Sequence, residues 1–119
     1  MRYMLLICDN EIEFEKTPEQ MVTEVMKEYG EYTAALREAG VYVSSHRLRP
    51  TGMAKSLRIR GGETLLTDGP YAETKEQLGG YYLIDVKDLE EAQGWAAKIP
   101  SARWGTIEIR PIWEMGEPS

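Results

Sequence analysis

Two segments of the chain, residues 3–8 (YMLLIC) and 80–86 (GYYLIDV), are typical of β-strands with apolar side chains on both faces. Successive side chains of a strand point to opposite faces, so strands of this kind need cover on both sides of their sheet. We therefore expect both segments in the middle of one sheet. This requirement constrains the fold most, because helices packed on one face leave the other face in need of a further layer.

A long helix is predicted after the first strand, over residues 18–39. The run Thr17-Pro18-Glu19-Gln20 has a capping residue followed by proline, which suits the first helical position. Gly40 is placed to end the helix in a left-handed turn. The expected buried stripe recurs at spacings of three and four and consists of Val22, Val25, Met26, Tyr29, Thr33 and Leu36.

The rest of the chain alternates strands with a second helix. A strand is predicted over residues 41–49, followed by a hairpin in which Gly61 and Gly62 form the tight turn between AKSLRIR and ETLLT. After the strand at 80–86, Asp88 is a predicted cap for a helix that Pro100 terminates. TIEIRPIWEM, from residue 106, forms the last strand.

This order predicts an α+β fold, the ferredoxin-like split βαβ with an extra β-hairpin, and residues 1–119 as a single domain. Both inner strands are apolar on the face that the helices leave open. We therefore expect a homodimer in which two sheets close a dimeric α/β barrel.

Charge and composition exclude several classes of protein. The 14 Lys and Arg against 20 Asp and Glu give a net charge of −6, which argues against nucleic acid as a partner. The chain has one cysteine, so nothing indicates an oxidising compartment. The apolar run at the N-terminus is shorter than the ~20 residues that span a membrane or the ~7–15 of a signal peptide. We expect a cytoplasmic protein with no membrane contact.

His46 is the side chain whose unperturbed pKa lies nearest neutrality. In the predicted strand it shares a face with Tyr42 and Ser44. It can move a proton if a carboxylate orients its ring, and Asp68, at the end of the strand before Gly69-Pro70, is the first candidate. Asp85 is a second candidate. A purely structural interpretation stays open, because a lone strand histidine is often hydrogen-bonded structure and Asp-Gly-Pro is a common turn.

No ligand spacing in the sequence indicates a metal site, and neither Gly-Gly pair precedes a phosphate-binding helix. No cofactor is therefore predicted.

The run TDGPYAETKEQLGGYYLIDVKDLEEAQGWAAKIP, residues 67–100, resembles the signature of the DGPF subfamily of YciI-like (YCII-related) proteins. Asp68, Gly69 and Pro70 match that motif, and Tyr71 stands where phenylalanine is usual. The resemblance implies a dimeric α/β barrel and a catalytic His–Asp pair in a cleft. It also implies an association with sigma factors.

Two functions follow as hypotheses. In the first, His46 and Asp68 form an acid/base pair acting on a small molecule, and Tyr42, Ser44, Arg47 and Tyr71 bind the substrate. In the second, the homodimer is a non-catalytic ligand-binding or regulatory module associated with a sigma factor. A polar rim over residues 67–80, with a helical turn or lid at 73–78, is expected in the first case.

Overall fold

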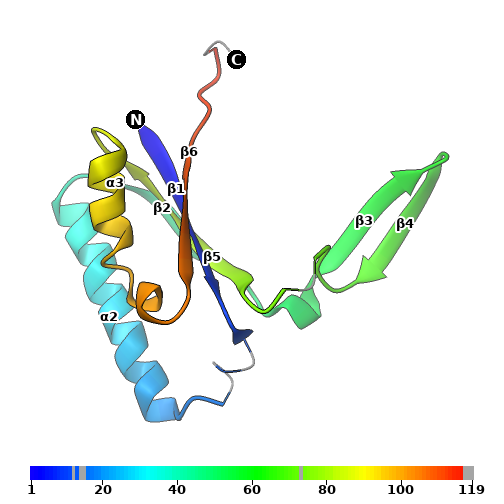
Figure 1. The fold of residues 1–119 in the computed structure, drawn as a ribbon, viewed down its shortest axis with the longest axis horizontal. Helices are drawn as coiled ribbons and strands as arrows, with labels where there is room; N and C mark the ends of the chain where they lie inside the picture. Colours follow the sequence, from blue (N-terminus) through cyan, green and yellow to red (C-terminus); the bar gives the residue numbers. More distant parts are fainter. Residues whose placement is uncertain (12, 14–15, 73, 117–119) are drawn as a thin grey trace.

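The computed structural model describes residues 1–11, 13, 16–72 and 74–116. Its body is an antiparallel sheet with strand order β2-β5-β1-β6 (Figure 1). These strands are β1 (Arg2–Asp9), β2 (Tyr42–Arg47), β5 (Gln77–Asp85) and β6 (Thr106–Pro111). The two segments with apolar side chains on both faces are thus the inner strands, as predicted. The fold is α+β, and its strand order is consistent with the expected ferredoxin-like plan.

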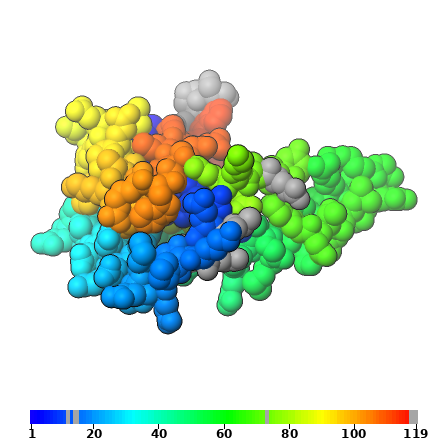
Figure 2. All heavy atoms as spheres, turned by 60° about the horizontal axis from the view of Figure 1, so that its bottom comes forward, coloured from blue at the N-terminus to red at the C-terminus, as the bar shows by residue number. Residues whose placement is uncertain are grey.

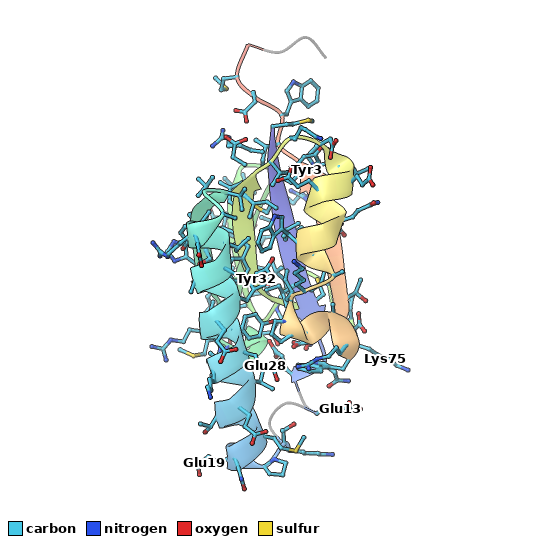
Figure 3. The ribbon with its side chains drawn as sticks, turned by 90° about the vertical axis from the view of Figure 1, so that its left-hand side faces the viewer. Tyr3, Glu13, Glu19, Glu28, Tyr32 and Lys75 are labelled. Carbon is cyan, nitrogen blue, oxygen red and sulfur yellow. The ribbon has the colours of Figure 1, made fainter. Side chains whose placement is uncertain are left out.

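Helices α2 (Glu19–Glu38) and α3 (Leu89–Ala96) lie side by side over one face of the sheet (Figures 1 and 3). Tyr32 joins them, because its ring meets Trp95 edge-on and its hydroxyl donates to the Trp95 carbonyl at 2.9 Å. A short 3₁₀ helix, η2 (Pro100–Arg103), follows α3. Among the described helices, none is long and apolar enough to cross a bilayer.

The core lies between the helices and the sheet. It contains the side chains of β1 and β5 that alternate toward the helices, together with apolar residues of α2 and α3. The buried set is Tyr3, Leu5, Ile7, Tyr32, Leu36, Val41, Tyr82, Ile84, Val86, Ala92, Ala96 and Ile99.

The helix ends agree in part with the predictions. Gly40 has φ 75° after α2, and the Asp88 carboxylate accepts from the Glu91 N–H at 3.0 Å, so both predicted signals are confirmed. The predicted Thr17 cap is wrong. Pro18 occupies the N-cap position without a side-chain cap bond, while the Thr17 hydroxyl donates to the Glu13 carbonyl at 2.9 Å.

The predicted hairpin is present as β3 (Lys55–Arg60) and β4 (Glu63–Asp68), which form a separate two-stranded sheet after the 3₁₀ turn η1 (Thr51–Met53). We call residues 55–68 the arm. It projects from the body on the side away from the helices (Figure 1), and it forms a distinct lobe in Figure 2. Asp68 therefore ends an arm strand, not a strand of the main sheet.

The sheet face turned away from the helices is called the open face. Its side chains include Met4, Leu6, Tyr81 and Leu83 of the inner strands, all of them partly exposed. On β6 the same face carries polar groups, because Glu108 pairs with Leu6. An apolar strip thus runs along the middle of the open face.

Candidate functional site

A cleft of about 800 Å³ opens on the helix side of the sheet. Its walls come from α2, the end of β1, the end of β2, the start of β5 and the segment around η2. This volume lies within the ~300–1,000 Å³ typical of small-molecule sites. The residues that give the cleft its chemistry are Asp9, Glu11, Tyr29, Thr33, Ser45, His46, Arg47, Tyr82, Ser101 and Trp104.

Aromatic rings form one wall of the cleft. Tyr29 of α2 and Tyr82 of β5 are parallel, with ring centroids 6.5 Å apart. The Tyr29 hydroxyl shares a 2.5 Å hydrogen bond with the buried Ser101, and the Tyr82 hydroxyl bonds the Thr33 hydroxyl at 2.7 Å. Burial raises the pKa of both tyrosines, so their hydroxyls stay neutral at physiological pH. The wall thus consists of aromatic rings whose hydroxyl groups are held by hydrogen bonds.

Asp9 is one of two acidic residues in the described lining of this cleft, together with Glu11. It follows the buried part of β1 and is itself partly buried. Burial raises the pKa of the Asp9 carboxyl above its ordinary value, and the charges of Glu11 and Glu76 act in the same direction. A hydrogen bond from the Trp104 indole and the charge of Arg47 oppose this rise. A carboxyl with a raised pKa in a cleft is suited to proton transfer.

Two glycines allow the backbone to close around the cleft. A Cβ on Gly105 would lie 2.4 Å from the Cys8 carbonyl oxygen and 2.9 Å from the Asp9 Cβ. A Cβ on Gly80 would lie 2.8 Å from the His46 carbonyl oxygen. Any larger residue at either position would therefore displace backbone beside a cleft residue.

His46 belongs to the edge of the cleft, but its ring lies on the open face. It pairs with Tyr81 in the β2–β5 register, and the two ring centroids are 5.7 Å apart. The neighbouring Arg47 pairs with Gly80 and therefore faces the helix side with Asp9. The two residues thus contribute to different faces of the sheet.

Within the part of one chain that the structure describes, no hydrogen bond or ion pair joins His46 to Asp68. The Asp68 carboxylate instead binds the Lys55 ammonium on the arm and is largely exposed. Asp85, the second candidate partner, accepts from the N-terminal amine of Met1 at 3.0 Å and is the last residue of β5, four residues beyond Tyr81.

The other predicted binding residues are also dispersed. A bulge between Tyr42 and Ser44 turns Tyr42 to the helix side, where its hydroxyl bonds Ser45 at 2.7 Å. The prediction that Tyr42 shares a face with His46 is therefore wrong, whereas Ser44 does lie on the open face opposite Leu83. Tyr71 is exposed on the arm side, with the Arg58 guanidinium 4.7 Å from its ring centroid.

The expected lid at residues 73–78 is also wrong in its described part, because β5 already begins at Gln77; Glu73 lies outside the described residues. Of the six predicted site residues, the cleft includes His46 and Arg47. Sequence reasoning missed Asp9 and Ser101. An acidic residue directly after a buried strand was the available signal for Asp9.

In the described ranges, no group of three or more His, Cys, Asp and Glu side chains is placed to hold a metal ion.

Comparison with known proteins gives two matches over nearly the whole chain. The model of the YCII-related domain matches residues 1–116. An uncharacterized protein of Rhizobium meliloti is 38% identical over 114 residues, which cover 94% of this chain and 92% of that relative.

Proposed function

The chain belongs to the YCII-related domain family, and from the cleft around Asp9 we propose that it is an enzyme that moves a proton on a small organic acid bound there. Asp9 is the proton donor and acceptor. Arg47 attracts the anionic group of the substrate, and the Tyr29 and Tyr82 rings hold its apolar part.

The observation that carries this proposal is the environment of Asp9. Its carboxyl is partly buried and receives a hydrogen bond from Trp104, and burial raises its pKa. Such a group exchanges protons nearer neutral pH than an exposed carboxylate does, which is what general acid/base catalysis requires. Arg47 on the same side adds positive charge without abolishing the rise in pKa.

The predicted pair of His46 and Asp68 remains a competing assignment for the same reaction. A homodimer offers a route to it, because a second copy brings a second arm to the assembly. The proposed homodimer closes two open faces against each other as an α/β barrel. The partly exposed strip of Met4, Leu6, Tyr81 and Leu83 supports this homodimer. Burying apolar side chains in an interface is favourable, so the strip would stabilise the contact between two open faces.

The test measures exchange of solvent deuterium into small 2-oxo acids, with pyruvate as the first probe, by proton NMR in D₂O. These acids combine a carboxylate with a C–H group next to a carbonyl. The wild-type protein should accelerate exchange, and Asp9→Asn should reduce the rate by about 10²–10⁴-fold. Arg47→Gln should mainly raise KM, while Arg60→Gln, a matched change on the arm, should leave KM unchanged.

Asp68→Asn and His46→Gln separate the two assignments. If these variants lose the exchange activity while Asp9→Asn retains it, the assignment to Asp9 is wrong and the predicted pair is supported. If the wild-type protein binds the acids without exchanging their protons, the enzyme proposal fails. The ligand-binding or regulatory module, the alternative associated with a sigma factor, is then favoured.

A further inference from the structure

The arm has little to stabilise it within its own chain. Its strands β3 and β4 pair with each other and form a sheet separate from that of the body. At its base, the Gly69 N–H donates to the Ala54 carbonyl at 2.8 Å, and the Ser56 hydroxyl donates to the Gly69 carbonyl at 2.8 Å. A two-stranded hairpin is at best marginally stable in water by itself. The arm therefore needs a surface to pack on.

One face of the arm is apolar. Leu57 pairs with Leu66 across the strands, and Ile59 pairs with Thr64 on the same face. The exposed fractions of Leu57, Ile59 and Leu66 are 60%, 61% and 64%. Contiguous exposed apolar side chains of this kind mark an interaction surface. The face ends at the ion pair of Lys55 and Asp68, which lies two residues beyond Leu57 and Leu66 in the same register.

The charge of the arm favours an acidic partner. The arm holds three basic and two acidic side chains, a net charge of +1, so the remainder of the chain, whose total is −6, carries −7. The body of a second copy of this chain is strongly acidic, whereas the arm is weakly basic. These complementary charges favour contact between the arm of one chain and the body of the other. The arm also projects on the side of the open face (Figure 1).

We infer that the arm of each chain packs its Leu57, Ile59 and Leu66 face against the body of a second copy, so that two chains exchange arms in the homodimer. The exchange rests on the proposed homodimer and is independent of the chemistry of Asp9. It buries the apolar face that the chain leaves exposed. Because Asp68 lies on the same face of the arm, the exchange also carries this carboxylate into the interface.

The test compares Leu66→Glu with Thr67→Glu. The two positions are adjacent on β4, both are exposed, and they lie on opposite faces of the arm. Sedimentation velocity over a concentration series gives the dimer Kd of each variant. Leu66→Glu should raise Kd by at least about tenfold, because a carboxylate replaces an apolar contact. Thr67→Glu should change Kd by less than about threefold, as is usual for substitutions at exposed positions.

Leu57→Glu, across the arm from Leu66, is a second variant and should also weaken the dimer. Hydrogen exchange gives an independent readout: arm amides should be protected in the dimer and exchange faster in Leu66→Glu at the same concentration. A dimer whose Kd is unaffected by either leucine substitution overturns the arm exchange and leaves the open-face dimer intact. A monomeric wild-type protein overturns both, and the arm would then bind a different partner.

Discussion

Replacing Gly105 with alanine tests whether the close approach of the β6 start to the β1 end holds the cleft together. In the native chain the Gly105 N–H donates to the Ser101 carbonyl at 2.7 Å. An added methyl group would lie 2.4 Å from the Cys8 carbonyl oxygen, 2.9 Å from the Asp9 Cβ and 3.3 Å from the Asp9 Cα. None of these atoms can rotate away, so the strand ends must separate.

The cost follows from this geometry. A methyl group forced into packed surroundings typically destabilises a protein by about 1–3 kcal/mol. We expect the upper part of that range, because the closest obstacle is backbone rather than a flexible side chain. For a chain of this size, each kcal/mol lowers Tm by roughly 3–6 °C, so a cost of about 2–3 kcal/mol in Gly105→Ala should lower Tm by roughly 6–18 °C.

Gly94→Ala is the matched control, because a Cβ at Gly94 in α3 meets no atom within 4 Å. Alanine is a better helix former than glycine, so this variant should be stabilised by up to about 1 kcal/mol. Thermal unfolding followed by circular dichroism, with urea unfolding at 25 °C, measures both changes. The reasoning is refuted if Gly105→Ala is as stable as the wild type, or if both substitutions destabilise the protein equally.

Three further predictions concern single groups. Burial raises the folded-state pKa of Asp9, so the unfolded chain loses this proton first as pH rises. The free energy of unfolding then falls as pH rises from about 3.9, the ordinary pKa of an aspartate, through the raised pKa of the folded state. Asp9→Asn should remove that loss in urea unfolding measured across pH, and an unchanged pH profile would contradict the assignment. Tyr29→Phe breaks the 2.5 Å bond to the buried Ser101 and should cost about 1–3 kcal/mol in urea unfolding. The exposed Tyr71→Phe should cost less than about 0.5 kcal/mol, and equal costs would show that the Ser101 bond does not stabilise the fold. Asp88→Ala removes the cap of α3 and should cost about 0.5–2 kcal/mol, with Asp88→Ser restoring most of it; a full loss in the serine variant would contradict the capping role.

Sequence reasoning fails at the candidate site for a specific physical reason. A strict two-residue alternation places Tyr42 on the same face as His46, but the bulge after Tyr42 reverses its side. A bulge adds one residue to a strand and leaves no reliable sign in composition. Similarly, the spacing of His46 and Asp68 in the chain does not reveal that Asp68 ends β4 in a sheet separate from that of His46.

The sequence by itself determined the order of the elements and which strands lie in the middle of the sheet. These properties follow from local patterns: apolar side chains on both faces at 3–8 and 80–86, the Gly61-Gly62 turn and the Asp88 cap. The tertiary structure decided which groups meet. Asp9, Tyr29 and the segment of Ser101 and Trp104 lie far apart in the chain, and only the packing of α2 and η2 on the sheet places them around one cleft. Long-range proximity depends on how complete elements pack, which no local pattern encodes.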